Sequence, residues 1–266
     1  MRTTGVLAAC AVWACAISAA RADDAPDPVY EPHYVPRLVG LGVALGLYLG
    51  SDTVAKDALA PDACRWCTPP SFDRSVHDHL VWDHPRRADT LSNVTASVSP
   101  LVALTAVVGS TFAHADHLAY FADDLLTVAE AGVYSQLAVQ ILKFSVGRQR
   151  PYAFDHSTAY GRGNDDNLSF VSGHAARTFA LATAAGTVAQ RRHLAYAPAI
   201  WAAGLALATA TMYFRIAADK HYLTDVLGGG AVGAAVGLGV PRLFGALPEG
   251  VTVVPAPGGV AAIGAF

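Results

Sequence analysis

Two long stretches without a charged residue constrain the fold of this chain more than any other feature of its sequence. They are Thr90–Ala113 and Leu194–Phe214. Each is long enough to cross a bilayer as an α-helix, which takes about 20 apolar residues. Only 15% of the residues are charged, against roughly a quarter in a typical soluble domain. The sequence therefore predicts helices that either lie in a membrane or pack around an unusually apolar core.

Other apolar segments extend this pattern to an all-α fold, a helical bundle of about five to six helices. We expect further helices at Leu38–Gly50, Asp116–Val146, Ser172–Gln190 and Lys220–Leu243. The 24 glycines of the chain favour close approach of such helices. The tail Val251–Phe266 alternates weakly around a Pro-Ala-Pro-Gly-Gly sequence, which favours a short C-terminal β-hairpin.

Composition divides the chain into four parts, 1–22, 23–89, 90–243 and 244–266. The first resembles a secretory signal peptide, because Arg2 precedes an uncharged run and Ala20-Arg21-Ala22 matches a cleavage sequence. The alternative is an uncleaved anchor helix, but the run Gly5–Ala20 is shorter than a bilayer span. The second part is expected to be a linker, a short helix and a cysteine-containing loop, the third the bundle and the fourth a tail.

Cysteine usage agrees with export. Cys10 and Cys15 lie in the signal, so the mature chain keeps only Cys64 and Cys67. A redox pair and half of a metal site are alternatives, but the first needs a βαβ context and the second another ligand pair. In an exported protein we expect a structural disulfide between Cys64 and Cys67.

Three short motifs carry the residues suited to chemistry, and they follow one another in the bundle. They are Lys143 with Arg150-Pro151, Ser172-Gly173-His174, and Arg215 with His221 and Asp225. Lys143 and Arg150 flank the end of a helix, where both can reach one oxyanion. Ser172 and Gly173 open the next helix, whose first N–H groups and positive dipole also favour an anion.

The third motif supplies a histidine with a carboxylate partner. His221 and Asp225 are four residues apart, so on a helix they share a face. A carboxylate in that position can hold the imidazole in one tautomer and stabilise its charged form, and Arg215 adds a third cation. Each motif alone is commonly a helix cap, a surface pair or a dipole partner. Three cations, helix-start amides and two histidines together are typical of a site for phosphoryl transfer.

The combined pattern resembles the type 2 phosphatidic acid phosphatase (PAP2) and vanadium haloperoxidase superfamily over about Asp116–Leu243. The resemblance implies that His221 is the nucleophile, His174 the general acid and Asp225 the orienting partner of His221. It also implies that the phosphate oxygens bind to the remaining motif residues, which are Lys143, Arg150, Ser172, Gly173 and Arg215. The chain departs from the family pattern at Val171, in place of a proline, and at Phe214, in place of a serine.

The resemblance implies a metal-independent phosphatase with no cofactor. The expected substrate is a phosphate monoester or diphosphate, and a lipid phosphate is favoured. A soluble nonspecific acid phosphatase, a vanadate-dependent haloperoxidase and a binding protein without activity are the alternatives. Five further histidines are then expected to be surface or structural residues rather than metal ligands: His77, His79, His84, His114 and His117. The net charge of −3 argues against a nucleic-acid partner, which requires a basic surface.

The location of the active site depends on how many segments cross the membrane. Arg191-Arg192 and Arg242 lie at the end opposite the motifs, so the positive-inside rule predicts a periplasmic active site. With a cleaved signal, this orientation requires that Leu38–Gly50 does not cross. We expect this because that segment is shorter than a bilayer span. A soluble periplasmic protein is the alternative.

Overall fold

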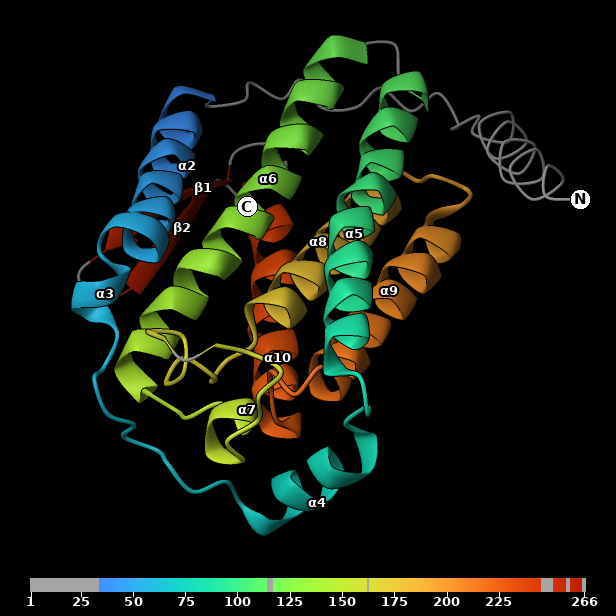
Figure 1. Ribbon diagram of the computed structural model, residues 1–266. Coiled ribbons are helices and arrows are strands. Elements are labelled where there is room, and N and C mark those ends of the chain that lie inside the picture. The colour runs from blue at the N-terminus through green and yellow to red at the C-terminus, as the bar shows by residue number, and fades with distance from the viewer. Residues whose placement is uncertain (1–33, 114–116, 162, 245–250, 257–258, 265–266) are drawn as a thin grey trace, which may run out of the picture.

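The computed structural model describes residues 34–113, 117–161, 163–244, 251–256 and 259–264 of the chain. The expected signal peptide, 1–22, and His114 lie outside these residues. The described part is an all-α bundle, as the sequence predicts, and six long helices form its body (Figure 1). They are α2 (Tyr34–Leu49), α5 (Pro85–Ala113), α6 (His117–Val146), α8 (Gly173–Arg191), α9 (Ala197–Ala217) and α10 (Leu223–Phe244).

Shorter elements fill the connections. The segment after α2 continues as a π-helical turn, η1 (Gly50–Val54), followed by α3 (Lys56–Leu59) and α4 (Ser71–Leu80). A four-residue helix, α7 (Pro151–Phe154), interrupts the loop between α6 and α8. In the tail, β1 (Val251–Ala256) pairs antiparallel with β2 (Gly259–Gly264).

Helix α8 forms the centre of the bundle. Its sequence is rich in alanine, and from Ala180 to Ala189 every residue is buried. Leu181, Ala185 and Val188 pack in the main core cluster with residues of α5, α6, α9 and α10. A helix surrounded in this way needs small side chains rather than a wide apolar face.

Glycines in α10 let it approach α8 closely. A Cβ atom on Gly233 would lie 2.1 Å from the carbonyl oxygen of Ala176, and one on Gly229 would lie 2.4 Å from that of Ser172. Gly237 makes the same kind of approach one turn later. Backbone contact at four-residue spacing is the packing that small residues permit between helices.

The first described helix corrects the expectation for Leu38–Gly50. Together with η1 it spans Tyr34–Val54, 21 residues, and is long and apolar enough to cross a membrane. The prediction was wrong because the helix begins before Pro36 and continues through the polar residues Ser51 and Asp52. Proline is tolerated in a first helical turn, where its missing N–H would have no partner.

An ion-pair network ties α2 to α6. Arg37 is buried, and its guanidinium lies 2.5 Å from an oxygen of Asp123 and 2.7 Å from an oxygen of Glu130. Glu130 is fully buried, so its charge faces Arg37 rather than lipid. Helix α2 is therefore part of the bundle and not an appendage of it.

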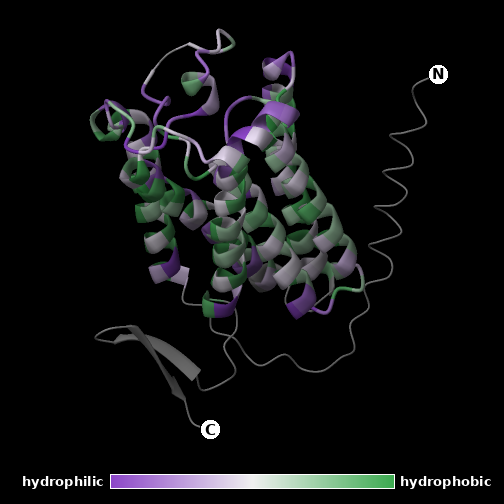
Figure 2. Cartoon of the chain, turned by 90° about the horizontal axis from the view of Figure 1, so that it is seen from below, coloured by the Kyte–Doolittle hydropathy of each residue, from purple (hydrophilic) through white to green (hydrophobic). Residues whose placement is uncertain are grey.

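In Figure 2, hydrophobic residues occupy the middle of the long helices and hydrophilic residues gather toward the two ends of the bundle. Within the described residues, α2 with η1, α5, α6, α9 and α10 each hold a segment apolar and long enough to span a membrane. Exposed apolar side chains cover these helices, among them Val39, Val43, Val98, Leu101 and Ile141. Central α8 is the exception among the long helices, and its burial explains why it needs no such surface.

Candidate active site

A polar cavity of about 330 Å³ opens at the end of the bundle where α6 ends and α8 begins, called here the site end. All three sequence motifs contribute to its walls. The motif residues that line it are Lys143, Arg150, Gly173, His174, Arg215 and His221. The other lining residues come mainly from α2, α5 and α6, and include Tyr48, Asp52, Asp89, Asn93, Gln136 and Gln140.

Local backbone structure positions the first two cations. Helix α6 stops at Gly147, which adopts a left-handed conformation with φ of 61°, a common C-terminal device of helices. Lys143 therefore projects from the last turn of α6. Arg150 precedes α7, where Pro151 occupies the first helical position, as prolines commonly do.

Arg150 is held directly against His221. Its Nε donates to the carbonyl oxygen of Asp165 at 2.9 Å, and its Nη1 lies 3.3 Å from His221 Nε2. A guanidinium can only donate, so this contact requires an unprotonated Nε2 on His221. The free electron pair of that nitrogen therefore faces the cations of the cavity.

Arg215 reaches the cavity from the end of α9. It is buried and paired with Asp89 of α5 at 2.7 Å. Its Nε is buried without a hydrogen-bond partner among the described residues. We name Lys143, Arg150 and Arg215 the cation cage, because all three act electrostatically on His221.

The relation between His221 and Asp225 differs from the expectation. His221 lies in the turn before α10, which begins at Leu223, so the pair does not share one helix. His221 Nδ1 is 3.6 Å from Asp225 Oδ2 and has no hydrogen-bond partner among the described residues. The carboxylate faces the correct nitrogen, but at ion-pair distance rather than hydrogen-bond distance.

Asp225 is instead fixed by three donors. Its Oδ2 accepts from the hydroxyl of Ser169 at 2.6 Å and from the backbone N–H of Tyr222 at 2.8 Å. Its Oδ1 accepts from Arg148 at 2.5 Å. The Tyr222 contact satisfies an N–H group just before the first turn of α10, as in a capping box.

Arg148 is the centre of this network. It is 1% exposed and bridges Asp225 to Asp73 of α4, 2.6 Å away. The rings of Trp66 and Tyr222 lie 3.9 and 4.5 Å from its guanidinium carbon. The planar, weakly hydrated guanidinium suits such a buried, stacked position between two carboxylates.

Ser172 and Gly173 have different environments. The backbone N–H of Ser172 donates to the carbonyl oxygen of Asp225 at 2.9 Å. Its hydroxyl is buried without a partner among the described residues, and Ser172 is not a lining residue. The expectation that its amide is free for an anion is wrong, because α8 begins one residue later and packs against the start of α10. Gly173 does line the cavity, in the first turn of α8.

His174 faces the cavity from the same turn. Its Nε2 lies 2.8 Å from Asn93 Oδ1 of α5, and this contact fixes the orientation of the ring. The two histidines of the motifs therefore both line one cavity, His174 from α8 and His221 from the turn before α10.

Burial and charge act together on His221. Loss of solvent lowers the pKa of His221 well below its usual value, and the positive charges of Arg150, Arg215 and Lys143 lower it further. The imidazole is consequently neutral near pH 7. A phosphate dianion in the cavity would offset these cations.

Lys220 and Asp165 extend the charged surroundings of the cavity. Burial and the nearby Arg150 lower the pKa of Lys220 to about 8. Burial raises the pKa of Asp165, but Arg150 and Lys56 outweigh it and hold this pKa below its usual value. Lys56 Nζ lies 2.8 Å from Asp165, so this ion pair connects α3 to the loop that carries Arg150.

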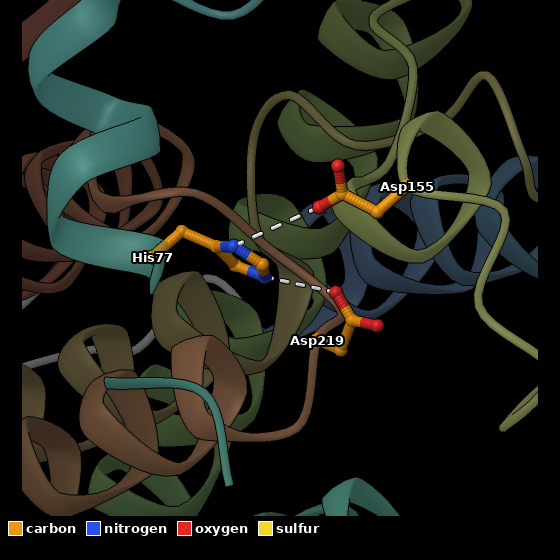
Figure 3. Close-up of side chains that lie close together, drawn as sticks. All are labelled: His77, Asp155 and Asp219. Atoms are coloured by element: carbon orange, nitrogen blue, oxygen red, sulfur yellow. Dashed lines mark hydrogen bonds and ion pairs between the residues drawn. The ribbon is translucent and has the colours of Figure 1, made fainter. Parts of the chain in front are cut away.

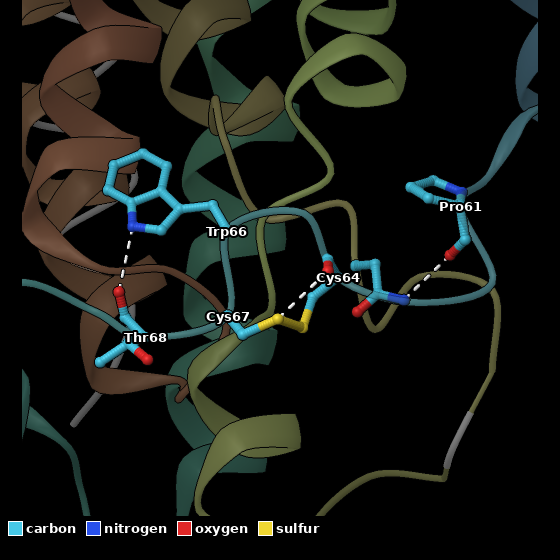
Figure 4. The surroundings of a disulfide bond; sticks show 6 residues. Pro61, Cys64, Trp66, Cys67 and Thr68 are labelled. Carbon is cyan, nitrogen blue, oxygen red and sulfur yellow. Dashed lines mark hydrogen bonds between the residues drawn. A yellow bond between two sulfur atoms is a disulfide. The ribbon is translucent and has the colours of Figure 1, made fainter.

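Cys64 and Cys67 are joined by a disulfide, which lies in the loop before α4 (Figure 4). Trp66, between them, pairs with Arg148 in an isolated parallel β-bridge. Its backbone oxygen accepts from the N–H of Gln149 at 3.1 Å. The disulfide thus closes a tight loop that carries one of the two rings against Arg148.

A second cluster lies beside the cavity and contains His77, Asp155 and Asp219 (Figure 3). His77 Nε2 is 2.8 Å from Asp219, and His77 Nδ1 is 4.0 Å from Asp155. Burial lowers the pKa of His77, but the hydrogen bond and charge of Asp219 outweigh it and raise this pKa overall. His77 thus joins α4 to the loop before His221, and the ligand atoms of the three side chains lie within 4.8 Å of one another, close enough to hold a metal ion. His79 and His84 are exposed.

Several residues of the site were not found from the sequence. Asp73, Asp89 and Asn93 precede the motifs by many residues, and only the fold brings them to the cavity or its network. Arg148 could have been found, because it lies between Lys143 and Arg150 in a short polar stretch. Both departures from the family pattern are packed: Val171 is 1% exposed, and Phe214 contacts the ring of Trp82.

The comparisons with known proteins agree with this site. Residues 124–248 match the family described as the PAP2 superfamily. No curated protein and no solved structure matches the chain. The matched segment contains all three motifs and the helices that carry them. The matched segment, 124–248, belongs to the PAP2 superfamily, a family of phosphatases and phosphotransferases.

Proposed function

We propose that this protein hydrolyses a phosphate monoester or diphosphate through a phosphohistidine at His221. One observation carries the proposal: a buried histidine presents an unprotonated Nε2 to three cations that line the same cavity. Preorganised cations at the site of charge development are the main source of catalysis in phosphoryl transfer.

The proposed reaction has two steps. His221 Nε2 forms a bond to phosphorus while the bond from phosphorus to the leaving oxygen breaks, and His174 donates a proton to that oxygen. Water then attacks phosphorus, the bond to Nε2 breaks, and His174 takes the proton of the water. The cation cage binds the phosphate oxygens in both steps. The first-turn amide of Gly173 adds a further donor, and Ser172 supports the turn.

Asp225 acts in this proposal as a fixed countercharge. Its position 3.6 Å from Nδ1 favours the tautomer with the proton on Nδ1, and it stabilises the positive ring that forms during attack. The residues around the site supply every proton transfer, so the proposed reaction needs no metal or cofactor.

The apolar helices support a lipid phosphate as substrate. Five described helices are long and apolar enough to cross a membrane, and the cavity lies at one end of them. A phosphate at the membrane surface would meet the cavity there. We infer an integral membrane protein rather than a soluble acid phosphatase, because large exposed apolar side chains recur along α2 from Val35 to Leu49 and along α5 from Leu91 to Phe112.

The orientation follows from the direction of α2. This helix begins at the end opposite the cavity and ends beside it, because Asp52 and Tyr48 line the cavity. A spanning α2 and a cleaved signal together would put the cavity in the cytoplasm. The disulfide at the site end favours an oxidising compartment, so we place the cavity in the periplasm. Tyr34 then lies on the cytoplasmic side of the membrane, and the signal-like segment, residues 1–22, is not cleaved from the chain.

Purified protein in detergent tests the activity. It should release phosphate from p-nitrophenyl phosphate and from phosphatidate without added metal, in the presence of EDTA, and vanadate should inhibit it. His221→Ala should lose both turnover and an acid-labile phosphoenzyme, whereas His79→Ala, on the exposed face of α4, should keep both. A phosphoenzyme that persists in His221→Ala, or complete inhibition by EDTA, would contradict the mechanism.

A further inference from the structure

Arg177 is a cation of the cavity that none of the three motifs contains. It lies on α8 three residues after His174, so the two side chains project from the same face of the helix. Arg177 lines the cavity, and its charge is close enough to act on both His174 and Tyr48.

Arg177 has no protein partner among the described residues. Its Nε is buried and makes no hydrogen bond, and no carboxylate forms an ion pair with it. Arg177 as a whole is half-buried. The fully buried arginines are paired: Arg37 with Glu130, Arg148 with Asp225, Arg215 with Asp89 and, at 4.0 Å, Arg150 with Asp165. A buried cationic donor without a partner is costly, so its position indicates a ligand that supplies the missing negative charge.

The surroundings of Arg177 are polar enough to hold such a ligand. Gln136 and Gln140 of α6 line the same cavity, and Gln140 donates to Asp52 at 2.9 Å. Tyr48 adds a hydroxyl from α2. Because Asp52 is engaged by Gln140 and by Lys56, 3.9 Å away, it does not neutralise Arg177.

The position along α8 indicates which part of a substrate reaches Arg177. Helix α8 runs from the site end into the bundle, so Arg177 lies about one turn deeper than His174. His174 is the proposed proton donor to the leaving oxygen. The leaving group of a membrane lipid therefore extends past His174 toward Arg177.

From this arrangement we infer that Arg177 binds a second phosphate, adjacent to the one that is cleaved, and that the substrate is a lipid-linked diphosphate. This inference rests on the proposed function. The terminal phosphate occupies the cation cage, and Arg177 binds the phosphate attached to the lipid. His221 Nε2 bonds to the terminal phosphorus as its bond to the bridging oxygen breaks. That oxygen takes the proton of His174 and leaves on the lipid monophosphate, and water then releases inorganic phosphate from His221.

Two substrates with the same chain test the inference. Farnesyl diphosphate and farnesyl monophosphate are compared in detergent micelles by phosphate release. Arg177→Gln should reduce kcat/KM for the diphosphate about 10- to 100-fold more than for the monophosphate, the usual effect of one lost charge-assisted contact. Arg177→Lys should recover part of this selectivity. Arg87→Gln, at an exposed arginine of α5 outside the cavity, should leave both rates as in the wild type.

Three results would overturn the inference. Equal losses on both substrates would mean that Arg177 acts on the reacting phosphate or on packing. No loss on either would mean that it makes no substrate contact. A larger loss on phosphatidylglycerol phosphate than on the diphosphate would mean that the second anion is a phosphodiester.

A binding measurement separates this inference from the proposed function. Methylene diphosphonate and methylphosphonate are titrated against the His221→Ala protein and followed by thermal stabilisation. The diphosphonate should bind more tightly, and Arg177→Gln in the same background should abolish the difference. If the difference is present but the wild type forms no phosphohistidine, the proposed reaction fails and the second phosphate site stands. If the wild type hydrolyses monophosphates and the difference in binding is absent, the proposed reaction stands and the second phosphate site fails.

Discussion

At the scale of single residues, the carboxylate of Asp225 depends on a side chain outside the motif that contains it. Arg148 binds Asp225 on one side and Asp73 on the other, in a site with 1% exposure. Removal of one partner from such a buried set leaves an uncompensated charge, which commonly costs about 3–5 kcal/mol. Arg148 is therefore expected to act through Asp225, as a positioning residue for His221.

Arg148→Lys should separate charge from geometry. A lysine keeps the positive charge but cannot bind two carboxylates and stack between two rings. We expect the free energy of unfolding to fall by about 2–4 kcal/mol and kcat to fall more than 10-fold, with KM little changed. Thermal unfolding in detergent and steady-state kinetics measure these effects. Arg65→Lys is the control, because within the described residues the Arg65 guanidinium binds the carbonyls of Phe144 and Ser145 and no carboxylate. An active Arg148→Lys enzyme would contradict the positioning role.

His221 should remain neutral at a pH where a free imidazole is charged. Its pKa is lowered by burial and by the cations Arg150, Arg215 and Lys143, so the protonated form appears only well below pH 6.5. A dianion in the cavity cancels part of this effect, and inorganic phosphate should therefore raise the pKa. Nitrogen-15 NMR of labelled histidines, with His221→Ala for assignment, measures both. Titration of His221 near pH 6.5 without phosphate would contradict the electrostatic description.

The motif spacing predicted which side chains meet and left their exact contacts open. Lys143, Arg150, His174, Arg215 and His221 line one cavity as expected. Their spacing reflects the ends of neighbouring helices, which sequence patterns indicate well. The amide partner of Ser172 and the 3.6 Å gap at His221 depend on where α8 and α10 begin to within one residue, a boundary that sequence reasoning does not fix.

At the scale of elements, the packing of α8 against α10 depends on glycine at fixed positions. Gly233→Val should destabilise the bundle, because any Cβ there would lie 2.1 Å from the carbonyl oxygen of Ala176. Overpacking commonly costs about 1–3 kcal/mol, and backbone contacts put this site at the upper end. Because α8 and α10 carry His174 and Asp225, activity should fall as well.

Gly239→Ala is the matched control for Gly233→Val. Apart from its chain neighbours and the adjacent backbone of α10 itself, no described atom lies within 4 Å of a Cβ placed on Gly239 in the same helix. Alanine is the better helix former, so stability should rise by up to about 1 kcal/mol. Melting temperatures of the two variants in one detergent give the comparison. Equal melting temperatures would mean that the close approach of α10 to α8 is not a determinant of stability.

The long helices were predictable and the short ones were not. Charge-free runs predicted α5 and α9, although α5 begins earlier, at Pro85, and α9 later, at Ala197. The segment between α2 and α5 was expected to be a loop, but it contains η1, α3 and α4. These elements are short and polar, so contacts such as His77 with Asp219 stabilise them rather than a repeating apolar pattern.

At the scale of the whole molecule, the two ends of the bundle should lie on opposite sides of a membrane. Ser75 on α4 and His193 in the turn between α8 and α9 are both exposed, one at each end. In a background with Cys10→Ser and Cys15→Ser, we expect a membrane-impermeant maleimide added to intact spheroplasts to label Ser75→Cys and not His193→Cys. Inverted vesicles should give the opposite result.

The labelling experiment also tests the proposed orientation. Labelling of His193→Cys alone in spheroplasts would place the cavity in the cytoplasm and agree with a cleaved signal. Labelling of both cysteines with the protein in the soluble fraction would exclude membrane insertion. The mass of the purified chain is an independent measurement, because removal of residues 1–22 conflicts with a periplasmic cavity and a spanning α2.

The family segment, 124–248, depends on charged partners that precede it in the chain, so we do not expect it to fold alone. Arg37, from a helix that precedes it, supplies the guanidinium that compensates Glu130 inside it. Arg215 likewise takes its carboxylate from Asp89, and Arg148 takes one of its two from Asp73. A shortened protein that starts at Thr90 would keep every motif, yet it would leave Glu130 without Arg37, Arg215 without Asp89, and Arg148 with one carboxylate instead of two. We expect it to be degraded or to aggregate, so expression of the shortened chain should yield no folded enzyme.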